Sequence, residues 1–252
     1  AYYLSKLPGN TQQEVTLYDD GTGQATKAAA GIISPWLSKR RNKRWYELAK
    51  AGADLLPQLA REANLSNAVY QQTGTIITRS NDADLESLYQ LAQNRRQDAP
   101  QMGTVSQLTS EEVSQMIPLL HQPHPGILVS GGARIDGAQY TESLLKIAQT
   151  KNLKVKNEKV SLNSDGNIVT ARGIVKFDRV IVATGGWLKQ TLEPLGIEAD
   201  IRTHKGQLIE LSVKNYEDHQ VMPVLMPEGE RDFIPFGNGS LIVGATHEDE
   251  NG

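Results

Sequence analysis

The sequence contains no cysteine among its 252 residues. Disulfide bonds, thiolate metal sites and a cysteine nucleophile are therefore excluded within this chain. It also contains no run of about 18 apolar residues, the length at which a helix can cross a bilayer, so we expect no membrane span. The lack of cysteine favours the cytoplasm as the compartment, because disulfide bonds are rare there.

A strong charge of one sign is also missing. The formal net charge of −3 gives no general electrostatic reason to bind nucleic acid or an anionic membrane. His121 and His124 flank prolines, but no third ligand follows at a recognisable spacing, so no metal site is predicted. No nucleophile-elbow motif is present, which leaves no basis for Ser-His-Asp catalysis.

The first half of the chain mixes short strands with helices. Residues 14–19 (EVTLYD) predict a strand, and apolar spacing around Trp45 and Leu59 predicts a helix of roughly 20 residues. Pro57 lies inside that pattern and is expected to kink or divide the helix. Further predictions are extended structure over 70–79, a helix over 82–96, a capping box at Thr109 and Glu112, and a helix start at Asp136 with Gln139.

The second half is rich in strands. Residues 180–183 (VIVA) form a compact apolar run, as expected for a parallel strand buried on both faces. The run ends in glycines, and a short helix is predicted over 187–192. Other strands are predicted at 153–155, 159–162, 168–171 and 174–177, and an antiparallel sheet at 206–213, 221–225, 232–236 and 240–245. This order predicts an α/β fold in which the chain crosses between two domains more than once.

Asp19 ends the first predicted strand. An acidic residue in this place accepts hydrogen bonds from a ribose in dinucleotide-binding folds, about 20 residues after a glycine fingerprint. That spacing puts the fingerprint at or just before Ala1. Ala1 to Leu7 also resembles the second half of a helix, which Pro8-Gly9-Asn10 breaks. We therefore expect a chain truncated at both ends, with Asp20 as a competitor for the role of Asp19.

The next feature is an alanine-rich loop, residues 23–35 (GQATKAAAGIISP). Small residues let the backbone approach a flat ligand closely, and the N–H groups can meet ring or phosphate oxygens. The alternative is a flexible surface loop, but this stretch is too apolar for an ordinary exposed linker.

At this point the sequence resembles the D-amino-acid oxidase family of flavoproteins, which includes glycine oxidase. The residues that carry the resemblance are the strand, its terminal acid and the T-x-A-A-A-G-I pattern of the loop. The resemblance implies that this pattern runs beside the pyrophosphate and ring of FAD. The implied cofactor contacts are Asp19, Thr26, Lys27, Ala29, Ala30, Gly31 and Ile32. No histidine lies in the loop, so noncovalent FAD is expected.

A second block resembles the same family. Residues 177–187 (FDRVIVATGGW) match its late strand and A-T-G-x-W turn, where glycines allow backbone approach and helical N–H groups favour negative charge. This block implies further cofactor contacts from Ala183, Thr184, Gly185 and Trp187. Val160 matches a position whose backbone meets the adenine. Residues 131–136 (GGARID), 205–207 (KGQ) and 241–246 (LIVGAT) also resemble family segments.

The resemblance implies four alternating segments. Residues 1–65 and 131–200 would form a Rossmann-like FAD-binding domain, three-layered with a mostly parallel sheet. Residues 66–130 and 201–252 would form an antiparallel-sheet substrate domain. Asp232, with Phe233 beside it, occupies a position that holds a substrate-side aromatic residue in glycine oxidase. A carboxylate there favours an amine or a substrate with a second cationic group, and a solvated strand end is an equal alternative.

The implied activity is oxidation of an amino acid or secondary amine by hydride transfer to flavin. The phosphate-binding glycines would precede Ala1, and the family arginine that pairs with a substrate carboxylate would follow Gly252. We therefore expect the chain by itself to bind FAD poorly and to be inactive. Two alternatives stay open. One is a nicotinamide-dependent dehydrogenase, which shares the strand and acid but does not explain the alanine-rich loop. The other is a non-catalytic module that kept the fold and lost the cofactor.

Overall fold

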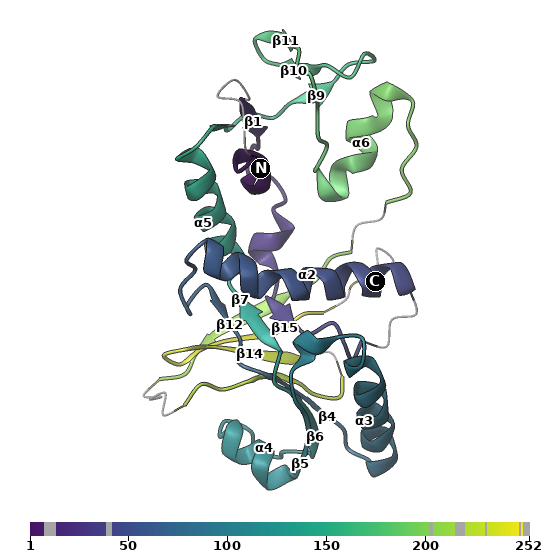
Figure 1. Ribbon diagram of the computed structural model, residues 1–252, viewed down its shortest axis with the longest axis vertical. Helices are drawn as coiled ribbons and strands as arrows, with labels where there is room; N and C mark the ends of the chain where they lie inside the picture. Colours follow the sequence, from purple (N-terminus) through teal and green to yellow (C-terminus); the bar gives the residue numbers. More distant parts are fainter. Residues whose placement is uncertain are drawn as a thin grey trace. The chain divides into compact units, whose positions relative to one another are not determined.

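The fold is described from a computed structural model (Figure 1), which describes residues 1–7, 14–38, 42–201, 204–214, 220–229, 231–246 and 248. The predicted break at Pro8-Gly9-Asn10 lies outside these residues. The chain forms two compact units. Unit 1 comprises Ala1–Gln24, Leu144–Lys205 and Glu248–Gly252, and unit 2 comprises Ala25–Ser143 and Gly206–His247.

Unit 2 is built on a seven-stranded sheet of order β12-β15-β14-β13-β4-β6-β5. Neighbouring strands are antiparallel except for the parallel pair β13 and β4. The predicted antiparallel sheet near the end of the sequence is confirmed, and strands from the first half extend it. The strands are β4 (Thr75–Thr78), β5 (Val105–Leu108), β6 (Gly126–Val129), β12 (Leu208–Ser212), β13 (Val224–Met226), β14 (Asp232–Gly237) and β15 (Ser240–Gly244).

Two helices flank this sheet on opposite sides (Figure 1): α3 (Asp82–Arg96) and α4 (Ser110–Met116). The bounds of α3 match the prediction. The predicted capping box is also confirmed. Glu112 N–H donates to Thr109 Oγ1 at 3.2 Å, and Thr109 N–H donates to the Glu112 carboxylate at 2.8 Å. These two bonds satisfy N–H groups that the first turn of a helix leaves without partners.

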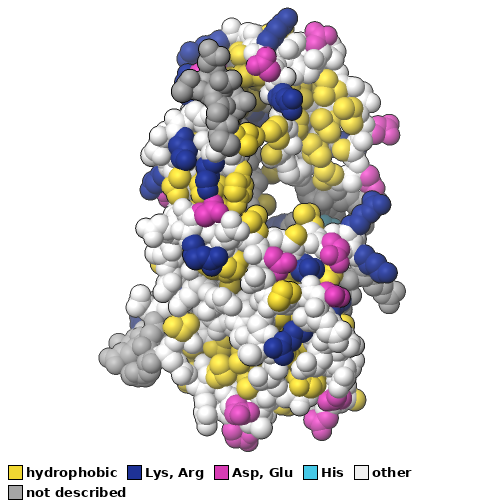
Figure 2. Space-filling view, viewed as in Figure 1, with side chains coloured by type: hydrophobic (Ala, Val, Ile, Leu, Met, Phe, Trp, Pro, Cys, Tyr) yellow, Lys and Arg dark blue, Asp and Glu magenta, His cyan; other side chains and the backbone are white. Residues whose placement is uncertain are grey.

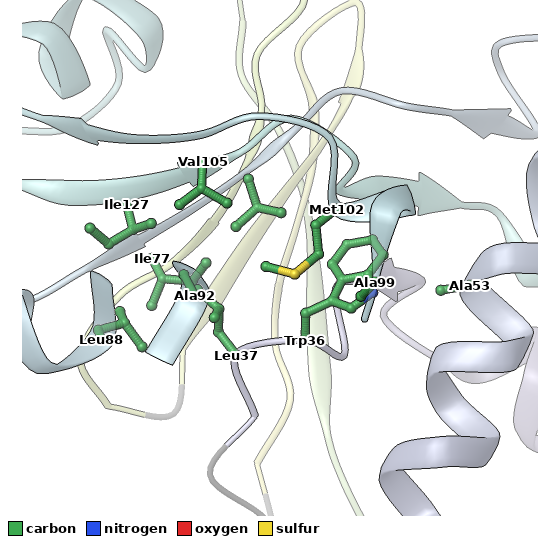
Figure 3. Close-up of a cluster of buried hydrophobic side chains, with 11 residues drawn as sticks. Trp36, Leu37, Ala53, Ile77, Leu88, Ala92, Ala99, Met102, Val105 and Ile127 are labelled. Carbon is green, nitrogen blue, oxygen red and sulfur yellow. The ribbon is translucent and has the colours of Figure 1, made fainter. Parts of the chain in front are cut away.

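Each helix covers its own apolar cluster, because successive strand residues point to opposite faces. Ile77 packs on the α3 side with Trp36, Leu88 and Met102 (Figure 3). Ile76, the adjacent residue of β4, packs on the α4 side with Val113, Ile117 and Leu225. The core of unit 2 therefore lies on both faces of one sheet.

A second, three-stranded sheet of unit 2 has the order β2-β7-β3, from β2 (Ile32–Ile33), β7 (Ala133–Ile135) and β3 (Tyr70–Gln71). The long helix α2 (Lys43–Glu62) has the predicted length of 20 residues. It continues through Pro57, so the expected division is wrong. A single proline removes only one N–H donor from the ladder, and Ala53, Leu59 and Ala60 on the flanking turns are buried.

Unit 1 contains smaller sheets. β1 (Val15–Tyr18) and β8 (Leu153–Lys156) form a two-stranded parallel sheet. Three short antiparallel strands follow: β9 (Ser161–Leu162), β10 (Ile168–Thr170) and β11 (Gly173–Val175). Its helices are α1 (Tyr2–Ser5), the second half of α5 (Gly137–Gln149) and α6 (Leu188–Leu192). The strand predictions for 14–19 and 153–155 are thus confirmed.

The predicted buried strand at residues 180–183 is wrong. The segment has no strand assignment, and the side chain of Ile181 is 68% exposed. A strand needs a neighbour for its backbone N–H and C=O groups, and the parallel sheet described in unit 1 consists of β1 and β8. Although residues 180–183 are apolar, they are not buried in this chain.

The fold class is nevertheless α/β, with both parallel and antiparallel pairing, as predicted. Within the described residues, no helix is both long and apolar enough to cross a membrane.

Candidate functional site

The acidic turn after β1 holds Asp19 in a defined position. One Asp19 carboxylate oxygen accepts the Gly21 N–H at 2.8 Å, and the Gln24 amide donates to both oxygens at 3.2 Å. Asp20 accepts the Thr22 N–H at 2.9 Å, and this hydrogen bond lowers the pKa of the Asp20 carboxyl. The turn thus presents two adjacent carboxylates, of which Asp19 is the more tightly held by side-chain contacts.

Trp187 lies against this same turn. A Cβ atom on Gly23 would lie 1.7 Å from the Trp187 ring, and Gly23 has a positive φ of 61°. Only glycine combines that backbone conformation with such close approach. The ring, which is 41% exposed, therefore brings the predicted A-T-G-x-W turn next to the loop that begins at Asp19. The structure brings these two predicted regions of unit 1 together.

The A-T-G-x-W turn itself is open. Ala183, Thr184 and Gly185 are exposed, and a Cβ on Gly185 would meet nothing within 4 Å. The helical segment predicted after it is present as the 3-10 turn Gly185–Trp187 followed by α6. With five residues, α6 is too short for the predicted attraction of negative charge to a helix N-terminus to carry weight. The accessible backbone of Gly185 is the stronger feature.

Val160 is half-buried and directly precedes β9. It belongs to unit 1, as Asp19 and Trp187 do. Because β9 covers only Ser161–Leu162, the strand is shorter than the predicted range 159–162, and Val160 lies just before it.

The alanine-rich loop is anchored tightly in unit 2. Gly31 has a φ of 81°, and a Cβ there would lie 2.0 Å from the Ile135 carbonyl oxygen. Ile135 N–H donates to Gly31 C=O at 2.8 Å. At the other end of the loop, a Cβ on Gly137 would lie 1.9 Å from the Thr26 carbonyl oxygen. Two glycines thus let the loop lie directly on β7 and the start of α5.

The middle of this loop is exposed although it is apolar. Residues 25–28 form a 3-10 turn, and the side chains of Thr26, Lys27 and Ala29 are exposed. Ala30 and Ile32 are half-buried, and Gly31 is buried. Apart from Lys27, the exposed side chains of this fixed backbone are small, which allows a flat ligand to approach closely. This cradle fits the predicted flavin.

The two substrate-side candidates point away from each other. Phe233 packs with the α4-side cluster and lines an apolar cavity of about 230 Å³ with residues such as Ile117 and Leu241. Alternation along β14 places Asp232 on the opposite, α3 face of the sheet. Ile33, at the end of the alanine-rich loop, packs on that α3 side. Asp232 is therefore the candidate on the same side as the loop.

The predicted residues divide between the two units. Asp19, Val160 and residues 183–187 lie in unit 1, whereas residues 26–32 and β14 lie in unit 2. Among the described residues, no group of three or more His, Asp or Glu side chains is placed to hold a metal ion.

Comparison with known proteins decides the family. A family described as FAD dependent oxidoreductase (DAO) matches residues 1–252, the whole chain. The chain belongs to the FAD-dependent oxidoreductase family DAO. FAD is the cofactor of this family, which confirms the cofactor prediction, and the match favours the flavin hypothesis over the nicotinamide alternative.

Individual relatives of this DAO chain agree. It is 36% identical to the uncharacterized oxidoreductase YurR of Bacillus subtilis, over 100% of this chain and 68% of that protein. It is 26% identical to a glycine oxidase of Pseudomonas aeruginosa, of which it spans 65% of the length. The crystal structure of iminodiacetate oxidase from Chelativorans sp. BNC1 matches 100% of the chain and 69% of that structure, with a TM-score of 0.91 and 28% identity.

Two residues that contact the predicted site segments are not indicated by the sequence motifs. Gln24 bridges both oxygens of Asp19, and an amide five residues after a strand-end acid is only a weak signal. Arg134 is the other. A charged residue in the middle of an otherwise apolar strand, between Ala133 and Ile135, is the signal that could have revealed it.

Proposed function

We propose that this protein oxidises an amino acid or a secondary amine with FAD as the hydride acceptor. The observation that carries the proposal is the match of the whole chain to iminodiacetate oxidase, at a TM-score of 0.91. Iminodiacetate is a secondary amine, and glycine oxidase, named for a primary amine substrate, is a second relative. The common feature is an amine nitrogen beside a carbon that loses hydride.

For the cofactor, we propose roles for residues in each unit. In unit 1, Asp19 accepts hydrogen bonds from the adenosine ribose, Val160 lies by the adenine, and Ala183, Thr184, Gly185 and Trp187 form a backbone surface for the nucleotide. In unit 2, Thr26, Lys27, Ala29, Ala30, Gly31 and Ile32 form the contact to the flavin side. When bound, FAD supplies the oxidising chemistry by accepting hydride from the substrate carbon.

For the substrate, we propose that Asp232 faces the amine. Its carboxylate lies on the side of the sheet where the alanine-rich loop ends, whereas Phe233 lines the cavity on the other side. A carboxylate is an acceptor for the N–H groups of an ammonium and attracts its charge. The sheet that carries Asp232 contains strands from residues 66–130 and 201–252, the segments we assign to the substrate domain.

We also propose that the protein works in the cytoplasm, because it has no cysteine and disulfide bonds are rare in that compartment.

Flavin titration of the purified full-length protein, stripped of cofactor, tests the cofactor role. We expect yellow protein on addition of FAD, and release of FAD on denaturation. Asp19→Ala removes charge-assisted hydrogen bonds worth about 1.5–3 kcal/mol, so FAD affinity should fall roughly tenfold to a hundredfold. Asp20→Ala is the matched control and should change the affinity by less than about twofold, because the hydrogen bonds described for Asp20 go to Thr22 in its own turn.

Substrate reduction of the flavin in the absence of oxygen tests the reaction. Glycine, N-methylglycine, iminodiacetate and a D-amino acid are compared by loss of the oxidised flavin absorbance. Bleaching by one of these amines supports the proposal. Full-length protein that binds no FAD, or whose flavin no amine reduces, contradicts the proposal.

A further inference from the structure

Arg134 is an almost completely buried cation, with 4% of its surface exposed. Burying a charge costs free energy unless hydrogen bonds satisfy it. One terminal nitrogen donates to the Gln71 side-chain oxygen at 2.8 Å and to Phe236 C=O at 3.3 Å, and the other donates to Ala68 C=O at 3.4 Å. The guanidinium also lies over the Phe236 ring, 4.6 Å from its centroid. Three hydrogen bonds and one ring contact hold the Arg134 side chain in a single position.

The backbone of Arg134 belongs to the strand that carries the alanine-rich loop. Arg134 is the direct neighbour of Ile32 on one side of β7 and of Gln71 on the other. The adjacent Ile135 holds Gly31 through the 2.8 Å hydrogen bond. Any shift of Arg134 along its strand would therefore move the end of this loop.

The side chain of Arg134 reaches a different sheet. Phe236, which it contacts through both carbonyl and ring, lies in β14, and β14 begins with Asp232. The ladder of β14 is irregular between Pro235 and Gly237, so strand pairing alone does not fix Phe236. The planar guanidinium supplies the missing fixed contact, since it donates in a rigid fork and stacks on aromatic rings.

We propose that Arg134 is a positioning residue that fixes the substrate-side strand β14 relative to the alanine-rich loop. Its backbone holds the loop and its side chain holds Phe236, so one residue sets the spacing between Asp232 and the flavin contacts of unit 2. This proposal rests on the proposed function for its consequence in catalysis. The structural claim, that Arg134 links β7 to β14, depends only on the contacts described above.

Arg134→Lys tests the link, because lysine keeps the charge but loses the fork and the planar stack. Hydrogen exchange of residues 232–237, measured by mass spectrometry on protein without FAD, is the first readout. If Arg134→Lys removes the stabilisation that about one hydrogen bond gives to β14, hydrogen exchange of residues 232–237 should become roughly tenfold faster. Phe236→Leu keeps the carbonyl acceptor, removes only the ring contact and should give a smaller increase. It serves as the second variant if Arg134→Lys does not fold.

Arg95→Lys is the matched control. Arg95 donates to the carbonyls of Trp36 and Ser38 and lies 4.6 Å from the Tyr46 ring centroid, so it makes the same kinds of contact on elements other than β14. Its replacement should lower the thermal midpoint without changing exchange in residues 232–237. Unchanged exchange in both Arg134→Lys and Phe236→Leu, or equal changes in Arg95→Lys, would overturn the link.

In the holoenzyme, the expected result is a rise in KM for the amine of roughly tenfold in Arg134→Lys, with kcat and FAD affinity within about twofold of wild type. A fall in FAD affinity as large as the rise in KM would instead mean that the whole variant is destabilised. That result would overturn the positioning role. If no amine is oxidised but exchange responds as expected, the proposed function fails while the link between β7 and β14 survives. The two proposals are thus separable.

Discussion

Residues 126–129 (GILV) and 180–183 (VIVA) are similar apolar runs, but the first is buried in a sheet and the second is largely exposed. The first forms β6 in unit 2, where Ile127 is completely buried between neighbouring strands and under α3. The second, in unit 1, pairs with no strand among the described residues, and Ile181 is largely exposed. Figure 2 shows apolar side chains gathered at the surface around α6, in the same unit.

The same difference holds for each unit as a whole. Unit 2 buries side chains on both faces of a seven-stranded sheet, whereas the sheets of unit 1 have two and three strands. The buried apolar side chains described in unit 1 are Tyr2, Ala148, Leu153, Leu162 and Ile168. A two-stranded sheet is marginal in water by itself. A strand-forming sequence therefore becomes a buried strand only where neighbours are available to pair with it.

The largest expected contrast comes from shortening one isoleucine in each run. Ile127→Ala deletes fully buried methyl groups and should lower the free energy of unfolding by about 2–5 kcal/mol. Ile181→Ala removes mostly exposed atoms and should change it by less than about 0.5 kcal/mol. Urea unfolding followed by circular dichroism measures both. A loss above about 2 kcal/mol for Ile181→Ala would mean that this run is buried in solution and would break the comparison.

A smaller contrast separates two glycines of positive φ, one in each unit. Gly185→Ala places a Cβ in open space and should cost only the left-handed backbone penalty of about 1–2 kcal/mol. In Gly31→Ala the Cβ meets the Ile135 carbonyl and disrupts the Ile135–Gly31 hydrogen bond. Its loss should be larger, about 2–3 kcal/mol or more. Thermal unfolding compares the two variants, and equal midpoints would show that the loop is not held against β7.

The smallest effect concerns two exposed carboxylates. Hydrogen bonds from the Ser80 hydroxyl, at 2.6 Å, and N–H, at 3.1 Å, lower the pKa of Glu228 in unit 2, just as the Thr22 N–H lowers the pKa of Asp20 in unit 1. A carboxyl whose pKa is lowered by folding stabilises the protein above its unfolded pKa and loses this effect as the pH falls through the lowered value. Glu228 links distant segments, whereas Asp20 bonds a residue of its own turn.

We therefore expect Glu228→Ala to lower the thermal midpoint at pH 7 slightly more than Asp20→Ala does. The difference from wild type should shrink for both variants as the pH falls below the ordinary carboxyl range and through the lowered pKa values of Asp20 and Glu228. Midpoints measured across this range check the sign. A difference that grows on acidification would contradict the assigned hydrogen bonds.

Local features of the sequence predict much of this structure. The bounds of α3, the capping box at Thr109 and the strand before Asp19 all follow from short-range patterns of apolar, capping and β-branched residues. The alanine-rich loop is recognisable for the same reason, since its composition is itself the signal. The roles of the individual site residues remain predictions.

Other features depend on residues far apart in the chain. Nothing within residues 126–129 or 180–183 says that only the first run finds partners. Likewise, strand alternation puts Asp232 and Phe233 on opposite faces, and only the packing of β14 decides which face each of them takes. Gly23 is a turn residue in sequence, and its need to be glycine comes from a tryptophan more than 160 residues later.

The sequence by itself determined most helices and strands, because these depend on composition and on spacings within a few turns of chain. Its resemblance to known flavoproteins indicated the family and the flavin cofactor. The tertiary structure decided which apolar runs are buried, which side of β14 each side chain faces, and that Arg134 joins two sheets. Burial and hydrogen bonding between distant segments are properties of the assembled chain, and no local pattern encodes the partner.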